Sequence, residues 1–185
     1  MKNLLLLVCA TLIFTASSFS QKYFTKNGKV NFDATAPSSP EKIEGINRSV
    51  TCVVDAKTGN MQFAVLMKGF EFERALMEEH FNENYMESTK FPKASFKGKI
   101  TGMPVINTSS NGSFNVQTEG ELTIHGVTQK ITAPAKLTVN GGKITGVSSF
   151  KIVLSDYKIV IPGVVAEKFS KETEITVTCI YEPRS

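Results

Sequence analysis

His80 and three nearby glutamates are the residues of this chain whose types could perform acid–base chemistry. Glu78, Glu79 and Glu83 lie within three positions of His80, and a histidine beside a carboxylate is a common general acid–base pair. A metal site would need further ligands, and His125 is the only other histidine in the sequence. Because His125 stands before a glycine, it suits a turn. We therefore expect no metal site, and we expect His80 to be a structural hydrogen-bonding residue or to face a ligand.

Nucleophilic chemistry has no motif in this sequence. No serine stands in the Gly-x-Ser-x-Gly pattern of a nucleophile elbow. Cys52 and Cys179 lie in the middle of apolar stretches, where a buried thiol is inert. In an oxidising compartment these two cysteines could form a disulfide or remain free, and the sequence leaves both possibilities open. We expect no catalytic residue and no cofactor.

The first 20 residues have the three regions of a secretory signal peptide. A basic residue is followed by the apolar run Leu4 to Phe14 and then by small residues. Ser18 and Ser20 stand in the small-x-small order of a cleavage site, which predicts a signal peptide over residues 1–20 and Gln21 as the first mature residue. No other stretch reaches the roughly 20 apolar residues of a membrane helix. We expect an exported protein, periplasmic or secreted, that does not span the membrane.

Residues 21–185 are numerous enough for one domain with a substantial hydrophobic core. No repeat or low-complexity linker divides them. Removal of Lys2 lowers the formal net charge from +4 to +3, which is too small to indicate a nucleic-acid partner, and the basic residues are scattered along polar faces. The sequence does not indicate the oligomeric state.

Apolar residues recur at every second position through much of residues 30–181, which is the period of a strand with one buried face. The turn signal Asn140-Gly141-Gly142 separates two of these stretches. Small residues on inward-facing positions, at Gly98, Gly120 and Gly146, suit the tight bends of a barrel. We predict an all-β fold, a single antiparallel β-barrel of about eight strands with a short helical insertion. A β-sandwich is the alternative.

The segment of residues 70–98 interrupts this alternation. Met77, His80, Phe81 and Tyr85 follow the spacing of a helix face. The segment also holds an unusual share of the large apolar side chains of the chain. Two roles fit this pattern: a short amphipathic helix that plugs the sheet, or part of the wall of an apolar ligand cavity.

Two segments carry a family resemblance. One is His80-Phe81 followed by Lys90-Phe91-Pro92-Lys93-Ala94-Ser95-Phe96-Lys97-Gly98, and the other is Glu119-Gly120-Glu121-Leu122-Thr123-Ile124-His125-Gly126-Val127-Thr128-Gln129. They resemble motifs of the YceI-like polyisoprenoid-binding family, and the likeness runs over most of residues 21–183. The resemblance implies a lipocalin-like barrel that holds an isoprenoid-type chain in its interior.

The resemblance and the apolar pattern together predict a set of ligand-binding residues. They are Phe63, Val65, Met67, Phe70, Phe72, Met77, His80, Phe81, Tyr85, Phe91 and Phe96. We expect a binding protein and not an enzyme, with an isoprenoid or another long-chain lipid as its partner. One alternative is an enzyme that acts on such a lipid, with His80 and a neighbouring glutamate as acid and base. Another is a barrel with a filled core and a purely structural or interaction role.

Overall fold

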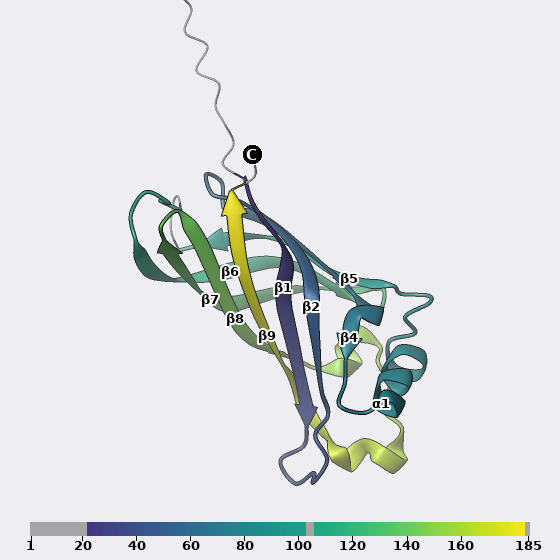
Figure 1. Ribbon diagram of the computed structural model, residues 1–185. Helices are drawn as coiled ribbons and strands as arrows, with labels where there is room; N and C mark the ends of the chain where they lie inside the picture. Colours follow the sequence, from purple (N-terminus) through teal and green to yellow (C-terminus); the bar gives the residue numbers. More distant parts are fainter. Residues whose placement is uncertain (1–21, 103–105, 184–185) are drawn as a thin grey trace, which may run out of the picture.

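The computed structural model describes residues 22–102 and 106–183, so the expected signal peptide and Gln21 lie outside the described residues. Strands make up most of the described chain (Figure 1). Their bounds are β1 Lys22–Thr35, β2 Glu44–Asp55, β3 Asn60–Leu66, β4 Phe70–Glu71, β5 Lys93–Thr101, β6 Gly112–Ile124, β7 Val127–Asn140, β8 Lys143–Ile152 and β9 Phe169–Pro183.

Eight of these strands close into an antiparallel barrel. Each long strand pairs with the next one along the chain, in the order β1, β2, β3, β5, β6, β7, β8, β9, and β9 returns to pair with β1. At this seam Val30 of β1 lies opposite Asn47 of β2 on one side and Val177 of β9 on the other. The predicted barrel is therefore confirmed. The alternative sandwich is wrong, because the single sheet closes on itself and leaves no long edge.

The register shifts between Met67 and Phe70, where the change of parity in the sequence predicts a β-bulge at Gly69. The shift takes the form of a 3-10 turn, η1, Met67–Gly69, after which β4 pairs with β2 at Asn47. Asn47 is fully buried and its Nδ2 donates to the carbonyl oxygen of Leu66 at 2.8 Å. A Cβ on Gly69 would lie 2.8 Å from that same nitrogen. A turn packed on a buried amide thus replaces the expected bulge.

Two hairpin turns lie where the sequence indicates them. His125 and Gly126 join β6 to β7 with φ of 49° and 75°, and Gly141 and Gly142 join β7 to β8 with φ of 57° and 79°. Positive φ at both central residues matches the twist of the flanking strands. Glycine adopts this conformation without strain, whereas His125 needs contacts that hold it there.

The helical segments gather at one end of the barrel. They are the short helix α1, Ala75–His80; the π-helical turn η2, Phe81–Tyr85; and the 3-10 turns η3, Leu154–Tyr157, and η4, Gly163–Lys168. In Figure 1, α1 and the yellow-green segment that precedes β9 lie at the lower end, away from the C-terminus. The predicted short helical insertion is confirmed. None of the described helices is long and apolar enough to cross a membrane.

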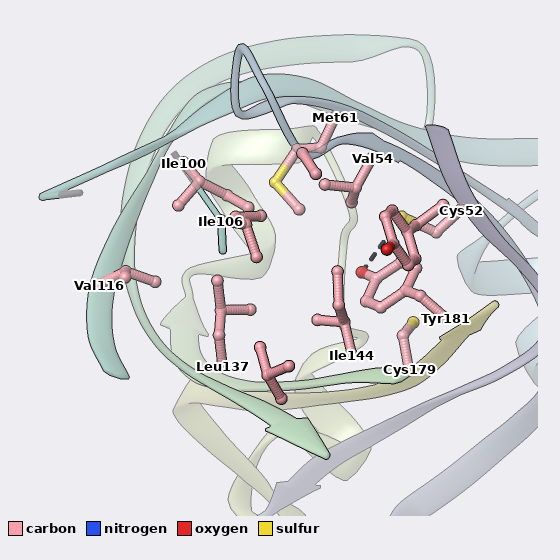
Figure 2. Packing of buried hydrophobic residues seen from close by; sticks show 13 residues of the cluster. Cys52, Val54, Met61, Ile100, Ile106, Val116, Leu137, Ile144, Cys179 and Tyr181 are labelled. Carbon is pink, nitrogen blue, oxygen red and sulfur yellow. Dashed lines mark hydrogen bonds between the residues drawn. The ribbon is translucent and has the colours of Figure 1, made fainter. Parts of the chain in front are cut away.

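The buried apolar residues form two clusters. The cluster in Figure 2 includes Cys52, Met61, Leu137 and Tyr181, and it fills the end of the barrel near the C-terminus. The second cluster draws on inward residues of the strands and on the η2 and η3 segments, and it fills the helix-bearing end. Cys52 and Cys179 are both buried free thiols.

A pair of glycines lets β5 and β6 approach closely. Gly98 of β5 lies directly opposite Gly120 of β6. The ring of Phe96 covers both positions, so that a Cβ on Gly120 would lie 2.8 Å from the ring and would also overlap the carbonyl oxygen of Lys97. The inward glycines therefore make room for an aromatic ring on the barrel wall.

Candidate ligand-binding cavity

The interior of the barrel contains an apolar cavity of about 200 Å³. It extends from Met61 and Tyr181 in the first cluster to Phe81 and Phe169 at the helix-bearing end. Within the described part of the chain, the residues that line it include no Asp, Glu, Lys, Arg or His. Seven of the predicted ligand-binding residues line the cavity: Phe63, Val65, Met67, Phe70, Phe81, Tyr85 and Phe96.

Phe81 covers the cavity at its helix-bearing end. Its ring stacks on Phe32 of β1, with ring centres 5.5 Å apart and planes inclined by 10°. It also contacts the rings of Phe70 and Phe72, at 5.2 Å and 4.9 Å between centres. Aromatic pairs of this kind contribute ~0.5–1.5 kcal/mol beyond the area that they bury. A chain that enters at this end has to displace the Phe81 ring or pass beside it.

The helix changes pitch at Phe81. The α-helical bonds of α1 are followed by an i to i+5 bond, from the N–H of Met86 to the carbonyl oxygen of Phe81 at 2.8 Å. Asn82 fixes this turn, because its Nδ2 donates to the Glu78 carbonyl at 3.0 Å and its Oδ1 accepts from Ser88 Oγ at 2.7 Å. A π turn rotates the residues that follow it relative to an α-helix. Both aromatic residues of η2 consequently line the cavity.

Four of the predicted ligand-binding residues do not line the cavity. Phe72 lies behind the ring of Phe81, and Met77 lies with Phe72 in an outer groove. One helical turn advances only ~5.4 Å along the helix axis, so a short helical segment reaches the barrel interior with only part of its length. That part is the later one, which carries Phe81 and Tyr85. His80 is exposed, so the acid–base pair of the enzyme alternative does not face the apolar cavity. Phe91 packs on the β6–β7 turn instead.

His125, Glu87, Tyr157 and Phe91, which we call the His125 clasp, join three segments at the helix-bearing end of the barrel. We call the opening of the cavity at this end, where Phe81 lies, the cavity mouth. The imidazole Nε2 lies 2.8 Å from Oε2 of Glu87, and Nδ1 lies 3.2 Å from the carbonyl oxygen of Tyr157. Phe91 meets the imidazole edge-to-face at 4.5 Å. The hydrogen bond to His125 holds the pKa of Glu87 below its ordinary value of 4.5. The sequence predicts only the turn role of His125, because its partners are 32 and 38 positions away.

Inward residues of β6 to β9 complete the cavity wall, and the sequence-based set omits them. The alternation of these strands shows which residues face inward. The alternation does not show which of these inward residues line the cavity and which pack in the cluster at the end of the barrel near the C-terminus. The additional lining residues include Leu122, Ile131, Ala133, Ile152, Thr173, Ile175 and Val177.

A family model of the YceI-like domain matches residues 12–180 of the chain. This chain belongs to the YceI-like family. The match spans most of the sequence, so the resemblance carried by the two sequence segments is confirmed. A comparison with curated proteins found no match.

Solved structures share the fold of this YceI-like chain. A polyisoprenoid binding domain from Saccharophagus degradans, implicated in plant cell wall breakdown, has a TM-score of 0.75 and 12% identity, over 89% of this chain and 99% of that chain. BcnA of Burkholderia cenocepacia has a TM-score of 0.68 and 18% identity, over 84% of this chain and 96% of that chain. The Campylobacter jejuni YceI protein has a TM-score of 0.53 and 17% identity over the full length of both chains. At these identities the likeness establishes the barrel fold.

Proposed function

We propose that this YceI-like protein is an exported carrier or sequestering protein that holds an isoprenoid or a similar long apolar chain inside its barrel. The observation that carries the proposal is the apolar cavity of the barrel interior, whose described wall has no charged side chain. Each buried methylene contributes ~0.8 kcal/mol, so a chain can bind there without an ion pair. The Saccharophagus degradans relative is named as a polyisoprenoid binding domain, which supports the same class of ligand here.

The size of the cavity favours the enclosure of a chain segment. A dry apolar cavity of ~150 Å³ accepts benzene, and the cavity of this barrel, at about 200 Å³, is only somewhat larger. A long chain therefore has to widen the cavity or continue outward past Phe81. Met67 and Met86 line the same end, and the flexible methionine side chain repacks readily around different ligands.

Extraction of the purified protein with organic solvent, followed by mass spectrometry, tests the carrier proposal. A stoichiometric, chemically unaltered lipid supports it. A lipid that is recovered as a reaction product favours the enzyme alternative. The proposal fails if no lipid is recovered and the protein also takes up no added prenol.

Replacement of Phe81 by leucine should weaken the binding of a long prenol by about fivefold and that of a short prenol much less. The long chain has to reach the Phe81 ring at the mouth, whereas a short chain is enclosed deeper in the barrel, and the loss scales with the contact area removed. Competition binding with a series of prenols of increasing length measures this dependence.

Phe114→Leu is the matched control, because Phe114 is an aromatic residue of β6 that packs against the cluster at the opposite end of the barrel and does not line the cavity. It should leave the length dependence unchanged, and so should His80→Ala. If Phe81→Leu also leaves the length dependence unchanged while the protein stays folded, the helical segment is a plug and does not contact the ligand.

The export component of the proposal depends on the N-terminal sequence alone. Sequencing of the N-terminus of the exported protein should give Gln21 as the first residue. A mature chain that retains Met1, or one that starts at a lipid-modified Cys9, would contradict it.

A further inference from the structure

Thr173 carries a buried hydroxyl that has no hydrogen-bond partner. Of the buried side-chain nitrogen and oxygen atoms in the described ranges, Thr173 Oγ1 is the one without a partner, and the residue is 2% exposed. Thr173 lies on β9 opposite Ile152 of β8, and it lines the cavity. It shares the inward parity of β9 with Ile175 and Val177, which also line the cavity. Thr173 is thus a residue of the cavity wall that carries an unpaired hydroxyl.

Three other polar side chains of the wall have partners within the protein. Thr118 Oγ1 donates to the carbonyl oxygen of Ala133 at 3.1 Å, and Ser148 Oγ donates to that of Pro134 at 2.7 Å. Tyr181 Oη lies 3.3 Å from Cys52 Sγ. A buried hydroxyl without a partner destabilises the folded protein. Thr173 therefore differs from these three groups, because it is a wall residue whose hydroxyl has no hydrogen-bond partner.

The wall around Thr173 selects against a charged ligand group. The described residues that line the cavity are uncharged, and the transfer of an ion into an apolar site without a counter-charge is strongly unfavourable. An alcohol or a carbonyl group has a much smaller desolvation cost, and one hydrogen bond to a hydroxyl compensates much of it. The uncharged wall and the unpaired hydroxyl of Thr173 thus both favour a ligand with a neutral, oxygen-containing group.

We propose that Thr173 Oγ1 hydrogen-bonds an uncharged oxygen group of the bound lipid, an alcohol or a carbonyl. This inference rests on the proposed function, because it assumes that a chain occupies the cavity. Thr173 is four positions from Phe169, whose ring contacts Tyr85 at the helix-bearing end with centres 5.7 Å apart. The polar group of the lipid accordingly lies near this end, and the hydrocarbon chain extends toward Met61 and Tyr181.

The test compares farnesol with farnesene, a hydrocarbon of the same chain, in the wild type and in Thr173→Val. Valine replaces the hydroxyl with a methyl group of similar size. The preference for farnesol over farnesene, expressed as the ratio of the two Kd values, should fall by about fivefold in this variant, which is the effect of one net hydrogen bond. Thr173→Ser retains a hydroxyl and should keep the wild-type preference. Farnesyl phosphate should bind the wild type more weakly than farnesol.

Thr178→Val is the matched control, because Thr178 lies on the same strand with the opposite parity and does not line the cavity. It should keep the wild-type preference. A second readout concerns the protein without ligand: Thr173→Val should raise its Tm by roughly 2–4 °C, because the unpaired hydroxyl is removed.

The outcomes separate this inference from the proposed function. If the wild type binds neither farnesol nor farnesene, the proposed function fails. If both bind and Thr173→Val leaves their ratio unchanged, the role of Thr173 is wrong while the apolar cavity remains the binding site. Binding of farnesyl phosphate as tight as that of farnesol would overturn the inference that the lipid group is uncharged.

Discussion

One imidazole ties two segments next to the cavity mouth to the barrel wall. Glu87 follows η2, Tyr157 ends η3, and both lie within hydrogen-bonding distance of His125. A carboxylate oxygen faces Nε2 and a carbonyl oxygen faces Nδ1, so both ring nitrogens have a partner. These contacts also hold His125 at its positive φ in the β6–β7 turn. Loss of the His125 clasp should therefore loosen the segments around the mouth without opening the barrel.

Glu87→Gln should lower the free energy of unfolding by an amount that depends on pH. The hydrogen bond from His125 lowers the pKa of Glu87 in the folded state. The charged carboxylate therefore stabilises the fold above the unfolded pKa of about 4.5, and this stabilisation is lost as the pH falls through the lower folded value. Urea unfolding should show the wild type more stable than the variant near pH 6, and the two proteins should converge below pH 4.5.

Glu83→Gln is the control for this series, since Glu83 is an exposed glutamate of η2 that does not contact His125. Its unfolding curves should stay close to those of the wild type. A constant difference between Glu87→Gln and the wild type from pH 6 to pH 3 would show that the carboxylate charge is not the stabilising element.

Individual site residues are the part of this protein that the sequence predicts least well. Phe81 and Tyr85 line the cavity as expected, but Met77 and His80 do not. A helical spacing defines a face, and it does not define how much of that face reaches the barrel interior. Thr173 gives no signal in the sequence, because a threonine at an inward strand position is ordinary and only its neighbours in space show that its hydroxyl is unpaired.

Whole strands are predicted far better, because a period of two is a local property of each strand. The alternating residues Val50, Cys52 and Val54 are all buried in β2. The failures occur where a local exception depends on a distant partner. The turn at Gly69 packs on the buried Asn47 side chain, whereas the sequence predicts a β-bulge at that position.

Replacement of Gly120 by alanine should destabilise the protein by ~1–3 kcal/mol. The new Cβ would overlap the Lys97 carbonyl oxygen and would lie 2.8 Å from the Phe96 ring, so β5 and β6 would have to separate. Gly163→Ala is the control, since nothing lies within 4 Å of a Cβ at that position, and it should leave the stability unchanged or raise it slightly. Urea denaturation measures both variants. Equal midpoints would show that the close approach of the two strands is not required.

Closure of the whole barrel determines the state of the two cysteines. Cys52 lies on β2 and Cys179 on β9, and β1 runs between these strands. Strands separated by one intervening strand have backbones about 9 to 10 Å apart, whereas a disulfide requires Cα atoms within about 7 Å. Gly28 of β1 leaves the space that the Cys179 sulfur occupies, since a Cβ there would lie 2.7 Å from Sγ. The fold accordingly keeps both thiols free and buried.

Cys52 and Cys179 should therefore resist a thiol-specific reagent as long as the barrel is closed. Their exposed fractions are 0% for Cys52 and 1% for Cys179, so a reagent reaches neither sulfur until the strands around it separate. In the native protein the labelling rate should follow the rate of global unfolding, and in denaturant both cysteines should react at once. Cys179→Ser should halve the labelled total in denaturant and leave the native rate of Cys52 limited by unfolding.

Rapid labelling of the native protein would mean that the seam formed by β2, β1 and β9 opens without global unfolding. A failure to label in denaturant without reductant would mean that the two cysteines form a disulfide after all.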